Sequence, residues 1–199
     1  MAQAALEAGV SIVTGDTKVV EKGHGDGLFI STSGLGEKIP GTCVSGKSAK
    51  PGDIVLVTGT MGDHGITILS QREGLGFEAQ VQSDTAPLNH ITEALLTALG
   101  EQVHVLRDPT RGGLATTLNE IAAQSKVSIE IDEQAVPIHP AVASACEFLG
   151  LDPLYIANEG KLIVIVEEDV AQEALSIIRS CKYGENAAVI GRVSSEQPG

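Results

Sequence analysis

The sequence predicts a layered α/β protein in which helices cover one face of a mixed β-sheet. Short apolar runs typical of buried strands alternate with amphipathic runs over residues 45–199, and 42% of the 199 residues are hydrophobic. The stretch "SGKSAKPGD" at residues 45–53 is rich in Ser, Gly, Lys and Pro, which is typical of a domain boundary. We therefore predict two parts, residues 1–44 and residues 45–199.

The first part is predicted to hold one helix followed by short strands. Residues 2–8 have helical character and precede Gly9, a residue suited to the left-handed position that ends helices. The runs "VSIVTG", "VVEKG" and "GLFISTSGLG" are predicted as strands separated by glycines. A short helix at the start suggests that the chain begins inside a domain, although a genuine first helix has the same pattern.

In the second part, each predicted strand is a short apolar or alternating run, and each predicted helix has apolar residues at helical spacing. The predicted strands are "DIVLVTG", "VHVL", "VSIEID", "KLIVIVEE" and "AAVIGRV". The predicted helices are "DHGITILSQREG", "APLNHITEALLTALG", residues 114–123, "PAVASACEFLG" and "DVAQEALSIIRSC". This alternation is the main argument for the fold class.

Composition argues against two kinds of partner. The formal net charge is −13 and only 3% of the residues are aromatic, which disfavours binding to a nucleic-acid backbone or to stacked bases. No apolar run reaches the length of a membrane span, and the first residues lack the pattern of a signal peptide. The three cysteines form no CxxC pair, which favours reduced thiols and a cytoplasmic protein.

The stretch "DPTRGG" at residues 108–113 directly precedes a predicted helix. Thr110 is a candidate cap, Gly112 and Gly113 leave room for a ligand near the backbone, and Arg111 is a bidentate donor beside the helix start. Such a helix start favours a bound anion. The alternative is an ordinary tight turn with a solvated arginine, and the residues alone favour that alternative.

Three further loops carry candidate polar residues. In "TGDTK", Asp16 is a candidate ligand of Mg²⁺ and Lys18 a candidate ligand of phosphates. The alternative is a plain turn with a surface lysine, and the residues alone favour that alternative. In "GTMGDHGI", Asp63 is a candidate N-cap and His64 is a residue of unassigned role. In "IANEGKLIV", Glu159 is either a general base or a solvated turn residue.

Taken together and in this order, "IVTGDTKVVEKG", "GTMGDHGITIL", "RDPTRGGLATTLNEIA" and "YIANEGKLI" resemble the HypE family of hydrogenase-maturation proteins. That family belongs to the ATP-using superfamily of aminoimidazole ribonucleotide synthetase. The resemblance implies MgATP-dependent dehydration of a carboxamide, carried as a thioester on a C-terminal cysteine, to a thiocyanate. It also implies delivery of cyanide to nickel–iron hydrogenase through the carbamoyltransferase HypF and the HypC–HypD complex, with a possible homodimer.

By the same resemblance, each candidate residue receives a role. Asp16 is expected to bind Mg²⁺, Lys18 to bind the phosphates or the carboxamide, and Glu159 to act as the base. Asn158 is expected to position that glutamate. The residues expected to line the phosphate-binding or tail-binding part of the cleft, or to lie near it, are Asp108, Arg111, Gly112, Gly113, Asp63 and His64.

The sequence departs from the family in two places. It ends in "SSEQPG" without the reactive cysteine, and it begins after the family's glycine-rich segment, so residues 1–44 resemble the latter part of an ATP-binding domain. We therefore expect weak or no ATP binding and no turnover by this chain alone. Two alternatives stay open: a non-catalytic module that docks onto maturation partners, or another superfamily enzyme such as a selenophosphate synthetase or thiamine-monophosphate kinase.

Overall fold

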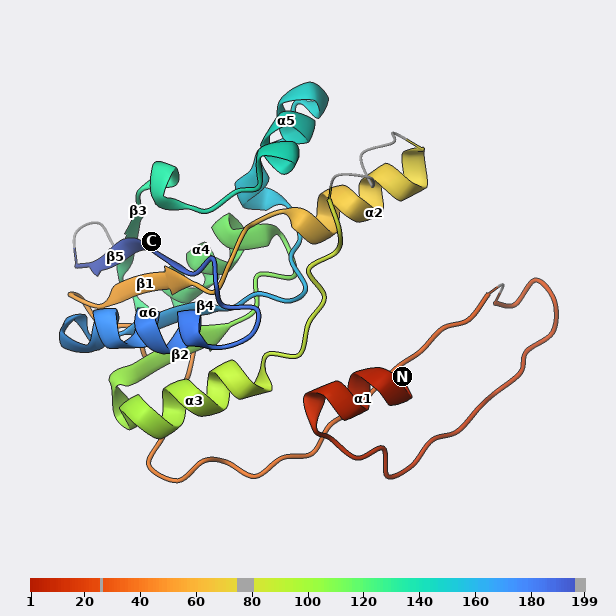
Figure 1. The fold of residues 1–199 in the computed structure, drawn as a ribbon, viewed down its shortest axis with the longest axis horizontal. Helices are drawn as coiled ribbons and strands as arrows, with labels where there is room; N and C mark the ends of the chain where they lie inside the picture. The colour runs from red at the N-terminus through yellow and green to blue at the C-terminus, as the bar shows by residue number, and fades with distance from the viewer. Residues whose placement is uncertain (26, 75–80, 196–199) are drawn as a thin grey trace. The chain divides into compact units, whose positions relative to one another are not determined.

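The chain forms two compact units, Met1–Pro40 and Gly41–Gly199, in the computed structural model shown in Figure 1. The structure describes residues 1–25, 27–74 and 81–195. Each unit is described here by itself. The predicted division after residue 44 stays a prediction.

The first unit contains the predicted first helix. Helix α1 (Ala2–Ala8) ends at Gly9, whose φ of 66° is the left-handed conformation expected of a glycine that ends a helix. The three predicted strands are wrong, because no strand is assigned among residues 10–25 and 27–40. A strand depends on pairing with a neighbour, and local β-propensity does not supply that neighbour.

The second unit is built on one antiparallel sheet. Its strands among the described residues are β1 (Ile54–Val57), β2 (Val103–Arg107), β3 (Ser128–Ile131), β4 (Ile163–Val166) and β5 (Ala188–Ser194). Their order across the sheet is β2-β4-β1-β5-β3, and every neighbouring pair is antiparallel. The α/β fold class is confirmed, whereas the predicted mixed sheet is wrong.

The order of the strands explains this error. Strands β1, β2 and β3, which are joined through helices, run in one direction, while β4 and β5 run in the other. Strand β4 lies between β1 and β2, and β5 lies between β1 and β3. Alternation of strands and helices along a sequence predicts parallel directions, but it does not show which later strand will separate the parallel ones.

The predicted helices of this unit are confirmed, with small changes at their ends. They are α2 (Asp63–Glu73), α3 (Asn89–Leu99), α4 (Gly113–Ser125), α5 (Pro140–Leu149) and α6 (Ala171–Ser180). Short 3-10 helices occupy Gly100–Gln102, Glu133–Ala135, Pro153–Tyr155 and Glu168–Val170. Among the described residues, none of the helices is long and apolar enough to cross a membrane.

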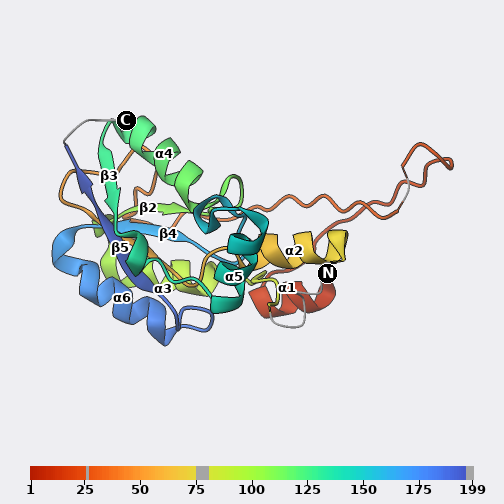
Figure 2. The same ribbon diagram turned by 90° about the horizontal axis from the view of Figure 1, so that it is seen from above.

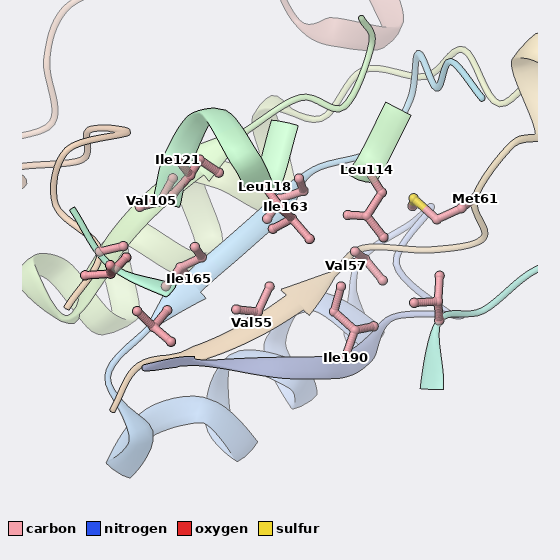
Figure 3. Close-up of a cluster of buried hydrophobic side chains, with 14 residues drawn as sticks. Val55, Val57, Met61, Val105, Leu114, Leu118, Ile121, Ile163, Ile165 and Ile190 are labelled. Carbon is pink, nitrogen blue, oxygen red and sulfur yellow. The ribbon is translucent and has the colours of Figure 1, made fainter. Parts of the chain in front are cut away.

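One face of the sheet packs against α4. Figure 3 shows Val55 and Val57 of β1 and Ile165 of β4 directed toward the apolar side of that helix. The helix contributes Leu114, Leu118 and Ile121. These three positions are spaced by four and three residues, so they lie on one side of the helix.

The opposite face is also covered, so the prediction of helices on one face is wrong. Leu56, Val164 and Val166 alternate with the residues that face α4, and they are fully buried. Helices α3 and α6 contact each other and lie on this side of the sheet, as Figure 2 shows. Strands that are apolar at every position, here "IVLV" and "IVIV", are typical of a sheet that is covered on both faces.

Candidate functional site

Three of the loops that carry candidate residues meet at one edge of the sheet, the edge where β1 and β2 end and β4 begins. Val57, the last residue of β1, pairs with Ile163, the first residue of β4, and Arg107 at the end of β2 pairs with the same residue. The chain leaves β1 toward α2, leaves β2 toward α4 and enters β4 at this edge. The strand directions therefore bring together "GTMGDHG", "DPTRGG" and "ANEG", which lie far apart in the sequence.

Asn158 connects these three loops. Its side chain is buried, and its Oδ1 accepts a hydrogen bond of 2.7 Å from the backbone N–H of Gly62, directly before α2. Its Nδ2 donates to the carbonyl oxygens of Pro109 at 3.3 Å and Ile156 at 2.9 Å. The backbone N–H of Asn158 also donates to Pro109. One amide thus satisfies backbone groups from each loop, which a hydrophobic side chain cannot do.

Glu159 is held through its backbone, while its side chain remains 39% exposed. Its N–H donates to Oδ1 of Asp84 at 3.1 Å. The next residue, Gly160, packs so closely against the backbone of Asp84 that a Cβ there would overlap it. The other carboxylate oxygen of Asp84 lies 3.5 Å from the Nζ of Lys161. The carboxylate of Asp84 is therefore held in place, while the carboxylate of Glu159 remains accessible.

His64, on the first turn of α2, lies beside Glu159. Its Nε2 is 3.9 Å from Oε1 of Glu159, and its Nδ1 is within hydrogen-bond distance, 2.9 Å, of Oγ of Ser83. The first distance is longer than a hydrogen bond, so the two groups interact through charge and dipole rather than direct contact. The structure thus places His64 next to the acid that we predicted as the base.

Asp63 is buried at the start of α2. The N-cap is Gly62 and not Asp63, so the prediction of Asp63 as the cap is wrong. Its carboxylate accepts a hydrogen bond from Oγ1 of Thr60. Burial raises the pKa of Asp63 above its ordinary value of 3.8, although the hydrogen bond from Thr60 and the charge of Lys161 oppose the rise.

The "DPTRGG" turn differs in detail from the prediction. Gly112 is the N-cap of α4, with a φ of 70°, and Thr110 is not. Gly113 has a φ of 69°, and a Cβ on it would overlap the carbonyl oxygen of Leu154. The close approach at Gly113 is therefore to another part of the backbone, which gives this glycine a packing role.

The two charged residues of this turn are exposed. Oδ1 of Asp108 lies 3.5 Å from one guanidinium nitrogen of Arg107. The other terminal nitrogen of Arg107 pairs with Glu120 on α4. Arg111 is exposed beside the start of α4. A role for Asp108, Arg111, Gly112 and Gly113 in binding phosphate or a peptide tail stays a prediction.

A polar cavity of about 200 Å³ adjoins the same edge of the sheet. Its lining includes both members of the Asp84–Lys161 pair and three residues with hydroxyl side chains, Thr60, Ser83 and Thr85. The side chains of Asp84 and Lys161 are only 3% and 10% exposed. The cavity therefore has a buried ion pair in its wall, which suits polar rather than apolar contents.

Asp16 and Lys18 belong to the first unit and are exposed there. Oδ1 of Asp16 accepts a hydrogen bond of 2.8 Å from the N–H of the next residue, Thr17. Within the described ranges, no group of three or more His, Cys, Asp and Glu side chains is arranged to hold a metal ion. Binding of Mg²⁺ by Asp16 stays a prediction.

Sequence reasoning missed the segment that supports this site. No motif includes Ser83 or Asp84, and Lys161 falls within a predicted strand. A lysine directly before the apolar run "LIVIV" was the available signal, because a buried lysine requires a partner. The identity of that partner, 77 positions away in the sequence, was not accessible to a reading of local patterns.

Comparisons with known proteins agree with this arrangement. The family model "AIR synthase related protein, C-terminal domain" matches residues 50–199. The carbamoyl dehydratase HypE of Azotobacter vinelandii is 55% identical over 197 residues, which are 99% of this chain and 58% of that protein. This chain thus spans less than two thirds of the length of that relative.

Two crystal structures are similar to this fold. The hydrogenase maturation protein HypE in complex with ATP has a TM-score of 0.92 and 57% identity, over 97% of this chain and 57% of that one. A HypE–HypF complex has a TM-score of 0.90 and 50% identity, over 98% of this chain and 64% of the matched chain. The chain therefore belongs to the family of AIR synthase related proteins, and within that family it is similar to HypE.

Proposed function

We propose that this chain carries the acid–base part of a HypE-like carbamoyl dehydratase that serves hydrogenase maturation. The observation that carries the proposal is the junction at Asn158, whose hydrogen bonds join the three motif loops of the second unit at one edge of the sheet. The 55% identity to a carbamoyl dehydratase extends over nearly the whole chain, which favours HypE chemistry over that of selenophosphate synthetase or thiamine-monophosphate kinase.

In the proposed reaction, a carboxamide held as a thioester loses its oxygen and two protons to become a thiocyanate. Transfer of the γ-phosphoryl group of ATP to the amide oxygen converts a poor leaving group into phosphate. The amide releases one N–H proton to solvent when its oxygen is phosphorylated and ADP leaves, and the carboxylate of Glu159 accepts the other as the carbon–nitrogen triple bond forms and phosphate departs. Its partial exposure, together with the fixed backbone beneath it, suits a base that must meet a substrate arriving from solvent.

The remaining residues contribute to binding in this proposal. Lys18 contacts the phosphates or the carboxamide, and residues 1–44 form the latter part of an ATP-binding domain. The exposed Arg111 at the start of α4 contributes to the phosphate-binding or tail-binding side of the cleft, together with Asp108, Gly112 and Gly113. Binding of Mg²⁺ by Asp16 belongs to the same proposal, and no step above depends on it.

The proposed partners follow from the similar structures and from the family. A HypE–HypF complex supports HypF as a partner, and the HypC–HypD complex and a homodimer are proposed from the resemblance alone. A cytoplasmic location is part of this proposal.

The second candidate function, a docking module without catalysis, predicts that HypF binds while the replacement of Glu159 has no effect on any reaction.

A hybrid protein tests the enzyme proposal directly. In the Azotobacter vinelandii relative, the 197 matched residues are replaced by this chain, and the C-terminal cysteine is carbamoylated by HypF. We expect ATP-dependent conversion of the carboxamide to thiocyanate, measured by mass spectrometry as the loss of one water. Glu159→Gln should slow the conversion about 100-fold or more, because general base catalysis contributes at least that factor.

Glu147→Gln is the matched control, because Glu147 is an exposed glutamate on α5. This control should react at the rate of the unmodified hybrid. If Glu159→Gln reacts as fast as the control, Glu159 is not the base. If the hybrid binds HypF but never converts the carboxamide, the docking function is favoured instead.

A further inference from the structure

We propose that His64 is a positioning residue for Glu159, and that Ser83 and Thr85 hold its imidazole with the Nε2 hydrogen directed at the carboxylate. The inference deepens the proposed function, on which it rests, because it assigns a role to a residue beside the candidate base. The motif containing His64 does not by itself reveal this role. It follows from the contacts of both ring nitrogens.

A chain of polar contacts leads to the imidazole. The backbone N–H of Thr85 donates to Oγ of Ser83 at 3.3 Å, and the two hydroxyl groups of these residues are 2.8 Å apart. Oγ of Ser83 is in turn 2.9 Å from Nδ1 of His64. Nε2, on the other side of the ring, is 3.9 Å from Oε1 of Glu159. The ring thus lies between a hydroxyl group and a carboxylate.

The carboxylate decides the direction of these hydrogen bonds. If Nδ1 carried the only ring hydrogen, the lone pair of Nε2 would face the negative oxygen of Glu159, which is unfavourable. With the hydrogen on Nε2, the N–H dipole points toward Glu159, and Nδ1 accepts the hydroxyl hydrogen of Ser83. Thr85 then donates its own hydroxyl hydrogen to Ser83. A protonated imidazole also carries the Nε2 hydrogen, so both forms present the same donor to the acid.

The same short segment holds the other half of the pair. Asp84, between Ser83 and Thr85 in the sequence, accepts the backbone N–H of Glu159. Its buried carboxylate is tied to Lys161. Residues 83–85 therefore position the backbone of Glu159 through Asp84. They position the carboxylate of Glu159 through Ser83 and His64. The positioning role predicted for Asn158 is thus shared with residues that the motifs did not include.

The series of contacts from Thr85 through Ser83 and His64 to Glu159 is called the relay below. Nitrogen NMR of this chain tests it. In long-range ¹H–¹⁵N spectra of the labelled protein, recorded with the imidazole neutral, His64 should have Nε2–H and an Nδ1 that accepts a hydrogen bond. The His64 signals are identified by their loss in His64→Gln. Ser83→Ala should shift the Nδ1 resonance toward that of an unbonded nitrogen, and Ser83→Thr, which keeps the hydroxyl group, should restore it. An Nδ1–H form in the unmodified protein, or an Nδ1 resonance that Ser83→Ala leaves in place, overturns the proposal.

A pair of substitutions at His64 tests its effect on Glu159. The amide nitrogen of Gln reaches the position of Nε2, whereas that of Asn reaches only the position of Nδ1. We expect the side-chain carboxyl ¹³C resonance of Glu159 at neutral pH to shift in His64→Asn and to remain near its original position in His64→Gln. Equal resonances in both variants contradict the proposal. These spectra require no turnover, so failure of the relay is distinct from failure of the dehydratase function, which the hybrid reports.

Discussion

The two ends of the same three strands each bury a polar cluster, and the two clusters differ in kind. At one end, where β1 and β2 finish and β4 begins, the neutral amide of Asn158 bonds to backbone groups of three loops. At the other end, Ile54 and Val103 pair with Val166, and the cluster beside them contains ionisable side chains. The comparison separates a junction that positions loops from one that connects strands.

The ionisable cluster is centred on His104. Its Nδ1 is 2.7 Å from Oδ2 of Asp53, and both side chains are about 95% buried. Its Nε2 is 3.0 Å from Nζ of Lys50, so this nitrogen accepts while Nδ1 donates to the carboxylate. Glu167, at the end of β4, lies 3.4 Å from the same Nε2. Asp53 and His104 each belong to or adjoin a strand, and their contacts hold strand ends together.

The difference shows what a buried polar residue does in each place. The amide of Asn158 both donates and accepts, so it can satisfy loop backbones that approach from different directions. The pair of Asp53 and His104 contacts Lys50, which precedes β1 by a few residues, and Glu167, which directly follows β4, so its contacts lie beside the ends of strands. We infer that the first cluster determines the geometry of the site, whereas the second contributes to stability.

The largest effect is expected for Asn158→Ala. The substitution leaves the buried N–H of Gly62 without its acceptor and removes the bonds of the amide to two carbonyl groups. We expect the free energy of unfolding to fall by about 3 kcal/mol, measured by urea denaturation. The NMR signals of His64 and Glu159 should move as well, because Glu159 directly follows Asn158 and His64 is on the first turn of the helix whose N-cap, Gly62, bonds to Asn158.

Asn119→Ala is the matched control for that substitution. The side chain of Asn119 is exposed on α4 and donates only to the carbonyl of Ala115 within the same helix. Its replacement should change the free energy of unfolding by less than about 0.5 kcal/mol. A similar loss for both asparagines would show that the junction at Asn158 has no special role.

A smaller loss is expected for Asp53→Ala at the other end of the strands. This carboxylate accepts from the backbone N–H of Lys50 and from Nδ1 of His104, so its removal leaves a buried ring nitrogen without a partner. We expect a loss of about 2 kcal/mol by urea denaturation. The partly exposed Glu167, replaced by Gln, should cost no more than about 1 kcal/mol.

The comparison is sharpened by spectra of the Asp53→Ala variant. If this end contributes only to stability, the His64 and Glu159 signals should remain in place while the protein is less stable. Movement of those signals would mean that the two ends are coupled through the strands. The division between a positioning junction and a stabilising one would then be wrong.

The smallest effect is expected for Asp63→Asn, and it depends on pH. Burial raises the pKa of Asp63 above 3.8, so the folded protein binds this proton more tightly than the unfolded chain does. The stabilisation from the protonated form is complete below 3.8 and is lost as pH rises through the raised pKa. Asparagine has no such proton and still accepts from Thr60, so we expect the variant to be more stable than the original at pH 7.

Urea denaturation at a series of pH values between about 7 and 4 measures this difference. The advantage of Asp63→Asn should shrink steadily as the pH falls. A constant difference over the range would show that the carboxyl group does not titrate with a raised pKa. An original protein that is the more stable of the two at pH 7 would show that the charged form is favoured in the folded state.

Much of the second unit was predictable from local patterns. Its strands and helices follow from apolar periodicity, as in "IVLV" of β1 and in the positions of Leu114, Leu118 and Ile121 on α4. The first unit was less predictable, because "VSIVTG" has β-propensity yet forms no strand among the described residues. Val13, in this stretch, and Val19, in "VVEKG", are both exposed, so neither side chain packs into a core within that unit.

The candidate site was predictable in part. Asp63, His64, Asn158 and Glu159 were selected from turns beside strands and from the family resemblance, and the structure brings them to one edge of the sheet. Their neighbours Ser83 and Asp84 lie in a loop whose local sequence has no distinguishing pattern. The packing role of Gly113 was not predictable either, because its close neighbour is the carbonyl of Leu154, about 40 positions further along the chain.

In the second unit, the sequence by itself determined which segments become helices and strands, because those choices depend on side-chain periodicity over a few residues. It also determined, through four motifs in order, the family to which the chain is similar. Only the tertiary structure decided that β4 and β5 separate the parallel strands, and hence that the sheet is antiparallel. It also decided that the imidazole of His64 lies between Oγ of Ser83, beside Nδ1, and Oε1 of Glu159, beside Nε2. Contacts of this kind join residues far apart in the chain, and their geometry depends on packing that local patterns do not encode.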